Sequence, residues 1–493
     1  MKQPTTPPYQ LVFTVAIKDE IPLEWLKALN VSVHTLKAVK AGSLKNRSIS
    51  GKNSGVLFII TGVGAKHSMD AAIWIKTHLQ PLYVVNIGSC GAIGNSAPMG
   101  TWITPVTIEN SEESQTQSID TRLPFSFPKS LTRKTRGRLL TVKKPEFGKI
   151  PDSWRTCHYI DMEAFHQAQV FADSDISFHL LKMISDESSH ETIELFQRML
   201  FIMRKQLKTI LSFLETPENA DITVIIPTYN RQKQVTNAIE SVLAQTLLPQ
   251  EIIVIDDGSN DSTQEVLKKY SDKITLIFSS QNHGVSFARN SAIMQSQSSW
   301  IALLDSDDLW SSNKLEKQWQ FLQACPFYQI MQSQEIWIRN GKRVNACKHH
   351  KKPQGWIWQE SLERCMISPS SVLIKRDLFA LYGTFDETLP ACEDYDLWLR
   401  ITRHHVVGLE ASPSLTRFGG HKDQLSSQYP AMDRFRISTL IKALDAEQEP
   451  HYRQALLRIL TKKLSILING YQKRDNQPMY KKYQTILTSL DPH

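Results

Sequence analysis

The stretch Leu303-Leu304-Asp305-Ser306-Asp307-Asp308 decides the fold of the second half of this chain. It puts carboxylates directly after an apolar run, and Val254-Ile255-Asp256-Asp257-Gly258-Ser259 shows the same pattern upstream. Apolar, β-branched runs of this length are typical of strands that are buried on both faces of a sheet. In a doubly wound α/β domain, ligands bind at the carboxyl ends of such strands. We therefore expect both acidic clusters to lie at one ligand-binding edge.

Strand and helix patterns alternate around these two stretches. This alternation predicts an α/β domain with a parallel, Rossmann-like sheet. The expected strands are 222–227, 251–255, 273–278 and 300–304, and the expected helices are 232–245, 261–270 and 285–296.

The first half of the chain has an α/β pattern of its own, and its β-α-β order predicts a parallel sheet. Its expected strands are 11–17, 56–60 and 82–87, and its expected helices are 71–79, 163–172 and 191–214. Residues 111–150 are polar and basic and contain proline, so their pattern predicts no element. The polar stretch Glu215-Thr216-Pro217-Glu218-Asn219 is typical of a linker.

These patterns divide the chain into two α/β domains and a tail. The domains are expected at 1–216 and 221–440, and a helical C-terminal extension at 441–493. The extension is basic, with Leu and Ile at helical spacing. This spacing favours packing on the preceding domain over contact with a membrane.

The composition narrows the class of partner. A net charge of +8 and a pI near 9.0 suit nucleotides, phosphorylated glycans or a membrane surface, or reflect a generally basic surface. No nucleic-acid-binding module pattern is present, so we expect no nucleic-acid partner. The six cysteines lack C-x-x-C spacing, and no stretch resembles a signal peptide or a transmembrane segment. We expect a cytoplasmic protein whose only membrane contact is peripheral, at the inner face.

Asp305 and Asp307 are the most informative pair of acids. Alternate residues of an extended segment face the same side, so their carboxylates converge and repel unless a cation lies between them. Mg²⁺ or Mn²⁺, held by one or two carboxylates and by substrate phosphates, satisfies this requirement. Asp308 is expected to cap the turn that follows. The pair therefore predicts a metal–diphosphate site.

Other polar residues at strand ends and in loops are candidates for the same site, and each has a structural alternative. The alternative for Asp256 is turn and helix-cap chemistry, although this fits Asp261 and Ser262 better. A surface position is the alternative for Arg289, and helix-dipole stabilisation for Asp394. The full set is Pro227, Thr228, Tyr229, Arg231, Asp256, Asp257, Arg289, Asp394 and His421.

In this order the residues resemble the family 2 glycosyltransferases of the GT-A fold, over about 222–425. The resemblance implies a nucleotide-sugar donor, commonly a UDP-sugar. Asp305 and Asp307 match the D-x-D metal motif, with His421 as a further candidate ligand. Asp394 matches the catalytic base of the E-D motif, which implies single-step inversion at a hydroxyl of a glycan or similar acceptor. The implied nucleotide contacts are Pro227, Thr228, Tyr229, Arg231, Asp256, Asp257, Arg289 and Asp305.

Glycines and acids also follow apolar runs in the first domain. Gly62 and Gly88 lie where expected strands end, and such glycines let backbone amides approach a ligand. Glu20, Glu163 and Asp186 follow apolar runs, and each can equally be a helix cap.

As a set these residues resemble the nucleoside phosphorylase and nucleosidase superfamily over about 11–210, particularly the methylthioadenosine/adenosylhomocysteine nucleosidase branch. The resemblance implies that Glu20 activates water, that Met162 and Glu163 hold a ribose, and that Asp186 is the general acid at the base. No arginine is placed to bind phosphate near the first strand, which favours hydrolysis over phosphorolysis.

Three interpretations stay open. In the first, both domains are enzymes. In the second, only the transferase is catalytic, and the first domain is a nucleoside sensor or a module for homo-oligomerisation. In the third, the whole chain is a nucleotide-binding scaffold without turnover, which the D-x-D pair and Asp394 argue against. Trp356 and Trp358 either stack on sugar rings of the acceptor or pack in the core.

Overall fold

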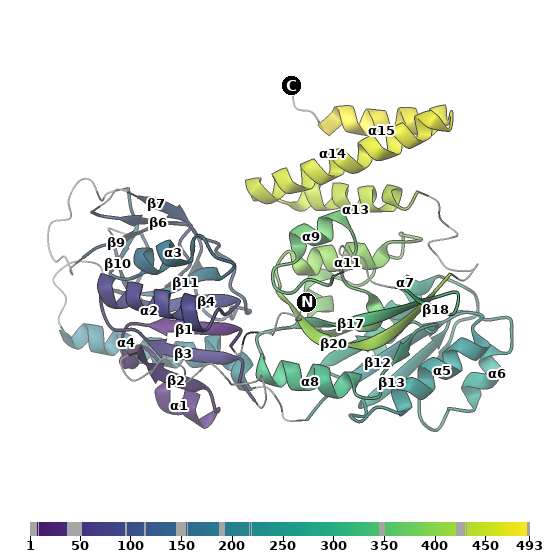
Figure 1. Ribbon diagram of the computed structural model, residues 1–493, viewed down its shortest axis with the longest axis horizontal. Coiled ribbons are helices and arrows are strands. Elements are labelled where there is room, and N and C mark those ends of the chain that lie inside the picture. The colour runs from purple at the N-terminus through teal and green to yellow at the C-terminus, as the bar shows by residue number, and fades with distance from the viewer. Residues whose placement is uncertain are drawn as a thin grey trace. The chain divides into compact units, whose positions relative to one another are not determined.

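The protein forms two compact units in a computed structural model. One consists of Met1–Glu218 with Gln320–Phe327, and the other of Asn219–Trp319 with Tyr328–His493. The structure describes residues 7–490 except for 8, 37–51, 94–95, 113–114, 144–153, 155, 187–192, 216, 218, 345–350, 421–428 and 430. Each unit has its own sheet flanked by helices (Figure 1). The expected two-part α/β fold is confirmed.

The first unit is built on an eleven-stranded sheet. Its strands are β1 (Leu11–Val15), β2 (Ser32–Thr35), β3 (Val56–Ile60), β4 (Tyr83–Ala92), β5 (Trp102–Ile103), β6 (Thr107–Asn110), β7 (Thr116–Ser118), β8 (Arg133–Lys134), β9 (Arg138–Thr141), β10 (Tyr159–Asp161) and β11 (Ser177–Asp186). Its helices are α1 (Leu23–Ala28), α2 (Ala65–His78), α3 (Ala164–Phe171) and α4 (Ile193–Ile210), with short 3₁₀ turns η1 (Lys18–Glu20) and η4 (Ser212–Glu215).

The centre of this sheet is parallel, as the sequence predicts. β1 pairs with β3 and β4, so that Leu11 lies opposite both Val56 and Tyr83. All five residues of β1 are buried, because the sheet is covered on both faces. β11 adds a further parallel strand beside β4. The loops after β1 and β3 and the ends of β4 and β11 therefore meet at one edge.

Three strands lie within residues 111–150, where the sequence pattern predicts no element. They are β7, β8 and β9. The residues of β7 and β8 are exposed or half-buried. Because these two strands bury no apolar face, hydrophobic periodicity could not reveal them.

The second unit is built on a nine-stranded sheet. Its strands are β12 (Ile222–Thr228), β13 (Glu251–Asp256), β14 (Thr275–Phe278), β15 (Trp300–Leu303), β16 (Leu309–Trp310), β17 (Ile330–Arg339), β18 (Lys342–Val344), β19 (Val372–Lys375) and β20 (Val407–Gly419). Its helices are α5 (Gln232–Leu243), α6 (Thr263–Lys268), α7 (Val285–Gln295), the first part of α8 (Lys314–Ala324, which continues into Gln320–Phe327 of the first unit), α9 (Trp358–Glu363), α10 (Asp377–Tyr382), α11 (Glu393–Thr402), α13 (Asp433–Ala446), α14 (Pro450–Lys473) and α15 (Gln477–Leu490), with a 3₁₀ turn η6 (Pro369–Ser371).

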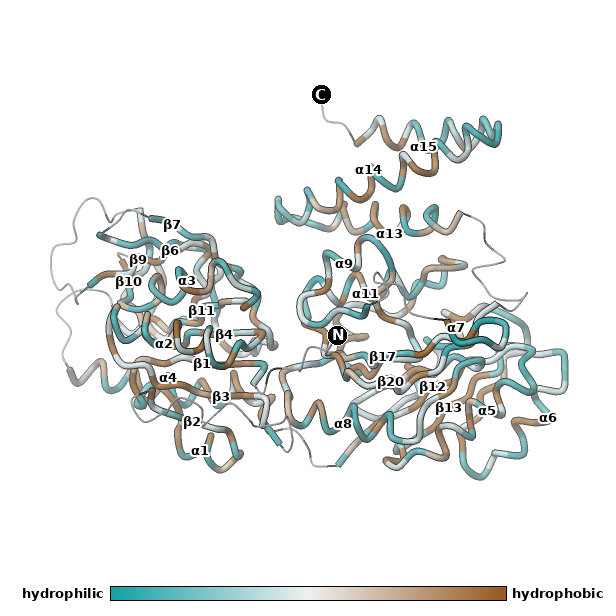
Figure 2. The backbone as a smooth tube through the Cα atoms, in the orientation of Figure 1, coloured by the Kyte–Doolittle hydropathy of each residue, from teal (hydrophilic) through white to brown (hydrophobic). Residues whose placement is uncertain are grey.

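The strand order of this sheet is β14-β13-β12-β15-β19-β17-β20-β16. The first four strands are parallel, and β19 then runs antiparallel to β15. Brown, hydrophobic segments lie along the strands of this sheet in Figure 2, and Ile225, Ile253 and Ile301 from three of these strands are buried in one apolar cluster. β12, β13 and β15 end at one edge, and the acidic residues follow them there. The two acidic clusters therefore share the edge that the sequence predicts.

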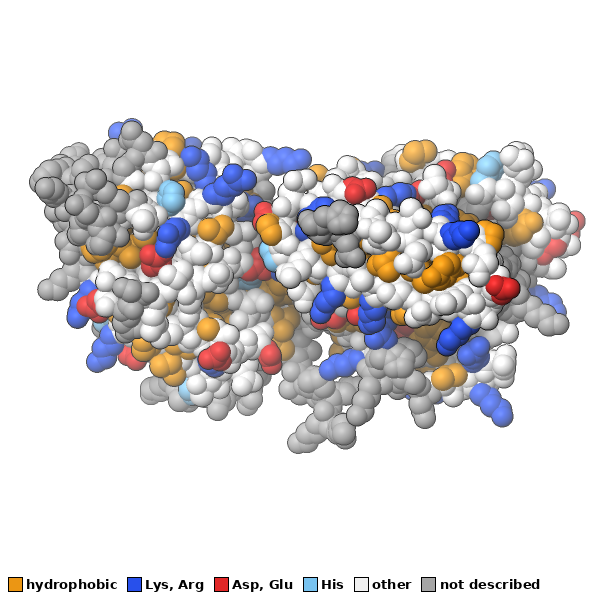
Figure 3. Space-filling model, turned by 90° about the horizontal axis from the view of Figure 1, so that it is seen from above, with side chains coloured by type: hydrophobic (Ala, Val, Ile, Leu, Met, Phe, Trp, Pro, Cys, Tyr) orange, Lys and Arg blue, Asp and Glu red, His pale blue; other side chains and the backbone are white. Residues whose placement is uncertain are grey.

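The C-terminal helices pack on the second unit. Leu456, Leu460 and Leu464 of α14 are buried with Tyr395 and Leu399 of α11 in one apolar cluster. The expected packing of the extension on the preceding domain is confirmed. No described helix combines the length and the apolar character that crossing a membrane requires. On the face seen in Figure 3, Lys and Arg side chains are spread out rather than gathered in one patch.

Candidate active sites

Glu20 lies at the ligand edge of the first unit. One of its carboxylate oxygens accepts hydrogen bonds from the N–H groups of Ala16 and Ile17, at 3.0 and 3.2 Å. The other oxygen accepts from the N–H and the hydroxyl of Ser89, at 3.1 and 3.3 Å. Burial raises the pKa of Glu20, although Lys182 and these N–H groups oppose the rise. Glu20 thus connects the loop after β1 to β4.

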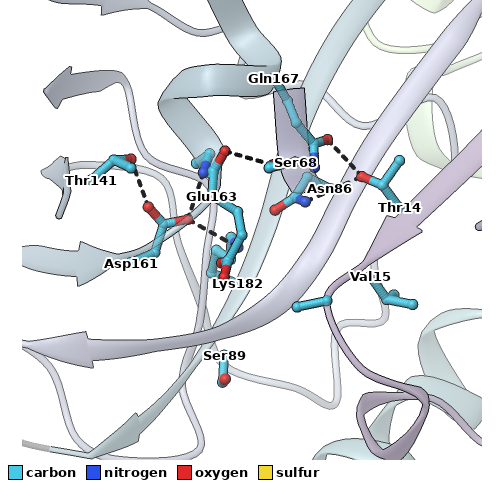
Figure 4. Close-up of polar contacts among 12 residues, drawn as sticks. Thr14, Val15, Ser68, Asn86, Ser89, Thr141, Asp161, Glu163, Gln167 and Lys182 are labelled. Atoms are coloured by element: carbon cyan, nitrogen blue, oxygen red, sulfur yellow. Dashed lines mark hydrogen bonds and ion pairs between the residues drawn. The ribbon is translucent and has the colours of Figure 1, made fainter. Parts of the chain in front are cut away.

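A buried lysine lies among the acids of this unit, and sequence reasoning missed it. Nζ of Lys182, on β11, is 3.0 Å from Oδ2 of Asp161 and 3.9 Å from Oε2 of Glu163. Burial opposes the charge of Lys182, but attraction to Asp161, Glu163 and Glu20 outweighs it and raises the pKa of the lysine. Figure 4 shows Asp161, Glu163 and Lys182 pointing toward one another. The only sequence signal was a charged residue inside an apolar strand.

Glu163 is held from two sides. Its Oε1 accepts from the N–H of Gly64, at 3.2 Å. A buried chain of hydrogen bonds runs from Thr14 to Gln167, then to Ser68 and to the carbonyl of Glu163 (Figure 4). Burial raises the pKa of Glu163 to about 7, against the attraction of Lys182. The carboxyl therefore occupies a defined position at the edge of the sheet.

The remaining residues predicted for this unit differ in their placement. A Cβ on Gly88 would lie 3.1 Å from Nζ of Lys182 and 3.2 Å from Oε1 of Glu20, so this glycine leaves room for both side chains. Gly62 has φ +96°, a backbone conformation that favours glycine. Met162 is half-buried against a small apolar cluster. Asp186 ends β11, but its side chain lies outside the described residues.

Asp305 and Asp307 follow β15 at the ligand edge of the second unit. Their side chains are 24% and 22% exposed, so both are accessible to a ligand. Oδ1 of Asp305 lies 2.7 Å from Nη2 of Arg289, and Oδ2 of Asp307 lies 3.4 Å from Nη1 of Arg231. The D-x-D carboxylates thus each have a cationic neighbour.

Arg289 connects the D-x-D loop to α11. While Nη2 contacts Asp305, Nη1 donates to Oε1 of Glu393 at 2.8 Å. Burial lowers the pKa of Arg289, but attraction to Asp305 and Glu393 outweighs it and raises the pKa above its ordinary value. The pKa of Glu393 is raised by burial and by Asp394, against the attraction of Arg289. The surface position considered as an alternative for Arg289 is wrong, because the side chain is 4% exposed.

Asp394 is the second residue of α11 and is half-buried. Its Oδ1 accepts from the N–H of Tyr395 at 2.7 Å. Its Oδ2 lies 3.3 Å from Sγ of Cys365, a thiol whose pKa is raised well above the ordinary value by burial and by Asp394. The preceding Cys392 has φ +64°, so α11 begins directly after a sharp turn. Sequence reasoning did not identify Cys365 as a neighbour of the predicted base Asp394.

Asp256 and Asp257 hold the loops around the ligand edge. Asp256 accepts from the hydroxyl and N–H of Ser259 and from the Gln264 amide, which is the turn chemistry considered above. Asp257 accepts from the N–H groups of His283 and Gly284, at 3.0 and 2.7 Å. Both carboxylates therefore shape the loops at the predicted nucleotide site.

The first predicted loop follows β12. Pro227 and Thr228 are buried at the end of the strand, while Tyr229 is 41% exposed at the same edge. Arg231 follows and reaches Asp307. The predicted metal ligand His421 lies outside the described residues.

Asp308 does not cap the turn, and this expectation is wrong. Its side chain is buried, with Oδ2 accepting from the Ser370 hydroxyl at 2.6 Å and Oδ1 accepting from the N–H of Phe418 at 3.3 Å. Burial raises its pKa to about 8, against the attraction of Arg417, whose Nε is 3.6 Å away. Asp308 therefore fastens the D-x-D loop to η6 and β20, which the local sequence could not show.

Comparison with known proteins identifies the family. A model described as Glycosyl transferase family 2 matches residues 223–375. WfgD of Escherichia coli, named UDP-Glc:alpha-D-GlcNAc-diphosphoundecaprenol beta-1,3-glucosyltransferase, is 33% identical over 187 residues, which cover 38% of this chain and 71% of that protein. The chain belongs to glycosyltransferase family 2. The family predicted from the D-x-D and E-D motifs is thereby confirmed.

Other relatives are matched over a smaller share of their length. An uncharacterized glycosyltransferase of Rickettsia bellii is 35% identical over 191 residues, which are 38% of this family 2 glycosyltransferase but 27% of the relative. A solved structure of 5'-methylthioadenosine nucleosidase from Arabidopsis thaliana aligns with 43% of this glycosyltransferase and 98% of its own chain, at 15% identity and a TM-score of 0.33. A functional proposal for the first unit therefore has to rest on the arrangement of its own residues.

The D-x-D pair of this glycosyltransferase fits a divalent metal bound to a nucleotide. Among the described residues, no group of three His, Cys, Asp or Glu side chains is arranged to hold a metal ion. Mg²⁺ and Mn²⁺ at nucleotide sites commonly need only one or two carboxylates, because substrate phosphates complete the coordination. Asp305 and Asp307 supply two accessible carboxylates of this kind.

A buried charge cluster lies beneath the D-x-D loop of the glycosyltransferase. Arg417, next to Asp308, has its Nη1 3.8 Å from Glu335, and Nζ of Lys352 lies 2.9 Å from the same carboxylate. Burial opposes the ionisation of Glu335, but Lys352 and Arg417 outweigh it and hold its pKa below the ordinary value. These residues come from β17, β20 and the segment before α9. Sequence reasoning missed all three.

Proposed function

We propose that the second unit transfers a sugar from a UDP-sugar to a hydroxyl of a glycan, with inversion at the anomeric carbon. The observation that carries the proposal is the Arg289 bridge. It holds Asp305, beside the predicted diphosphate site, and Glu393, beside the predicted base Asp394, on one guanidinium. A single-step displacement needs leaving group and base in a fixed relation, because the oxygen that the base deprotonates attacks the same carbon that the diphosphate leaves.

The residues of the chain divide the chemistry among them. Asp394 takes the proton of the acceptor hydroxyl, and the resulting oxygen attacks the anomeric carbon from the face opposite the diphosphate. Arg231, next to Asp307, is close enough to the D-x-D loop to neutralise charge on the leaving group. Asp305 and Asp307 would hold Mn²⁺ or Mg²⁺, which would supply further positive charge to that leaving group. Tyr229 offers an exposed ring for the nucleoside base.

The donor and acceptor classes are suggested by a relative. WfgD is named for UDP-Glc as donor and for a GlcNAc-diphosphoundecaprenol acceptor. For this chain we propose a UDP-sugar donor and a glycan acceptor, with a peripheral approach to the membrane if that glycan is lipid-linked. The basic net charge of +8 is consistent with an anionic acceptor carrier.

The transferase proposal is tested by donor turnover. Purified full-length protein is incubated with UDP-Glc and UDP-GlcNAc, with Mn²⁺ or Mg²⁺, and UDP release is measured. We expect metal-dependent release that is lost with EDTA and in Asp307→Ala, and that falls at least a hundredfold in Asp394→Asn. An exposed acid, Asp445→Asn on α13, is the matched control and should keep full activity. Activity that survives both EDTA and Asp307→Ala would contradict the metal assignment.

We propose further that the first unit binds a nucleoside and hydrolyses its N-ribosyl bond. The observation that favours this proposal is the pairing of two buried acids, Glu20 and Glu163, around Lys182 at one sheet edge. A carboxyl with a raised pKa is suited to accept a proton from water near neutral pH. Glu163 and Met162 would hold the ribose, and Asp186 would protonate the base.

Base release tests this second function. Methylthioadenosine, adenosylhomocysteine and inosine are offered to the full chain, and free base is quantified. We expect release that is lost in Glu20→Gln and Asp186→Asn but retained in Asp307→Ala. Nucleoside binding without release would favour a sensor. If the chain neither binds nor cleaves these nucleosides, the remaining role for the first unit is an oligomerisation module. The oligomeric state of the chain then tests that role.

A further inference from the structure

A cavity of about 520 Å³ lies in the second unit, on the side of the C-terminal helices. It is bounded by α11, by the end of α10 with the loop that follows, and by α13 and α14. Asp396, Leu399 and Arg400 of α11 line it at helical intervals, and Arg403, directly after α11, continues the same row. Asp394 is not among the lining residues. The cavity is therefore separate from the candidate transfer site.

The size of the cavity suits a small organic ligand. Binding sites of roughly 300–1,000 Å³ are typical for such molecules. The walls include rigid elements on three sides, since α11, α13 and α14 share the apolar cluster described above. A preformed site of this kind loses little entropy on binding.

The charges around the cavity cancel in pairs. Nη2 of Arg400 lies 2.7 Å from Oδ2 of Asp396, and Nε of Arg403 lies 2.6 Å from Oε2 of Glu447. In the third pair, Nζ of Lys442 lies 2.5 Å from Oδ2 of Asp386. Three cations therefore face three anions, and a strongly charged ligand such as a nucleoside diphosphate gains nothing from the net field. What the pairs do offer is N–H donors and carboxylate acceptors side by side.

Vicinal hydroxyl groups match this arrangement. Each hydroxyl both donates and accepts, so a pair of adjacent hydroxyls can donate to a carboxylate and accept from a neighbouring guanidinium. Side chains that are already paired stay ordered. Arg400 donates to Asp396 and to the carbonyls of Tyr382 and Thr384, so the donors that remain for such a ligand lie on Arg403 and Lys442. A neutral, polyhydroxylated molecule therefore fits the polar part of the cavity.

Aromatic rings supply the other part of the wall. Tyr382 is half-buried, stacks on His404 at 5.3 Å and bonds through its hydroxyl to His405 at 3.0 Å, so its ring is fixed in place. Trp358 is 3% exposed and packs edge-on against Tyr452, which assigns it to the core rather than to the acceptor site. Tyr382 and His404 both line the cavity, and the electron-rich face of an aromatic ring attracts the C–H face of a sugar.

We propose that this cavity binds a neutral saccharide unit, at a site distinct from donor and acceptor positions in the transfer reaction. The inference goes beyond the proposed transferase function, because binding here needs none of the catalytic residues. A glycan held at this place would keep a growing or membrane-linked chain close to the enzyme between transfers.

The test fills the cavity without breaking any contact. Ala446, on α13, lines the cavity and is exposed, so Ala446→Trp places a large side chain into the opening. The neighbouring Asp445 is exposed and does not line the cavity, so Asp445→Trp is the matched control. Full-length wild type and variants are applied to an array of neutral and acidic bacterial oligosaccharides, and affinities for retained glycans are measured by calorimetry.

We expect wild type, Asp445→Trp and the transfer-deficient Asp307→Ala to bind the same neutral glycans with equal affinity. Ala446→Trp should bind at least tenfold more weakly, with an unchanged thermal unfolding midpoint. Lys442→Ala, which unbalances one pair, should also weaken binding. The proposal is overturned if no neutral glycan is retained, if only acidic glycans are, or if Ala446→Trp binds as wild type does. Loss of binding in Asp307→Ala would likewise place the glycan at the transfer site instead.

Discussion

Arg289 and Asp305 form an ion pair of 2.7 Å, and the other terminal nitrogen of the same guanidinium lies 2.8 Å from Glu393. Arg289 belongs to α7, Asp305 follows β15 and Glu393 begins α11. Because the guanidinium is planar and its donors are rigidly placed, it sets the distance between the D-x-D loop and the helix that carries Asp394. The geometry of the proposed transfer site thus depends on one buried cation.

Replacing Arg289 should cost both stability and turnover. Arg289→Met leaves Glu393 buried without its cation, and breaking a buried pair in this way typically costs about 3–5 kcal/mol. Arg289→Lys keeps the charge but reaches one acid only, so it should retain more stability than turnover. Urea unfolding and UDP release measure the two effects. The exposed Arg343→Met is the control, and equal behaviour of the two methionine variants would contradict the bridge.

Removing the thiol beside the base should slow transfer without weakening donor binding. Cys365→Ala takes away a neighbour that lies 3.3 Å from Oδ2 of Asp394 and orients it. A net hydrogen bond of about 1 kcal/mol predicts a fall in kcat of roughly fivefold with KM unchanged. Cys365→Ser, which keeps a donor, should recover most of the rate. A rise in KM with constant kcat would show that Cys365 serves binding instead.

The stability of the first unit should fall as the pH rises through the range in which Glu163 titrates. Folding moves the pKa of Glu163 from 4.5 to about 7, so between these values the folded chain keeps a proton that the unfolded chain releases. The stability that this proton contributes is complete below pH 4.5 and is lost by about pH 7, a change of roughly 3 kcal/mol.

Glu163→Gln removes that titration and therefore isolates its contribution. Chemical unfolding of wild type and variant from pH 4 to 8 gives the difference in free energy of unfolding at each pH. The free energy of unfolding of the wild type minus that of Glu163→Gln should decline steadily as the pH rises. Glu20→Gln should show the same sign, since burial also raises the pKa of Glu20. A difference that stays flat, or one that grows with pH, would refute the assignment.

The C-terminal helices should behave as part of the core of the second unit. Leu460 of α14 is fully buried, so Leu460→Ala should destabilise the chain by about 2–5 kcal/mol through lost burial and an added cavity. Ile466, on the same helix, is 53% exposed, and Ile466→Ala should change stability by less than about 0.5 kcal/mol. Thermal unfolding of both variants checks the contrast. Equal effects would mean that α14 is not docked on this unit.

Much of the second unit was predictable because its signals are local. The run ending at Asp256 is apolar and β-branched, and the strand observed there is Glu251–Asp256. The short strands β7 and β8 of the first unit lack such a signal, because they bury no apolar face. Asp308 illustrates the same limit within the site. Its position after a strand was plain, yet its partners, Ser370 and Phe418, lie 62 and 110 residues away along the chain.

The sequence by itself determined the alternation of strands and helices around the parallel centre of each sheet and the edge at which the acids gather, since hydrophobic periodicity and acids at strand ends are properties of neighbouring residues. Only the tertiary structure decided which charges meet. Arg289 reaches Glu393 across 104 residues of sequence, and Lys182 of β11 meets Asp161 of β10 and Glu163, the residue before α3. Such pairings depend on how crossovers bring distant elements together, and burial then makes them obligatory, because an unpaired charge in the interior is too costly to keep.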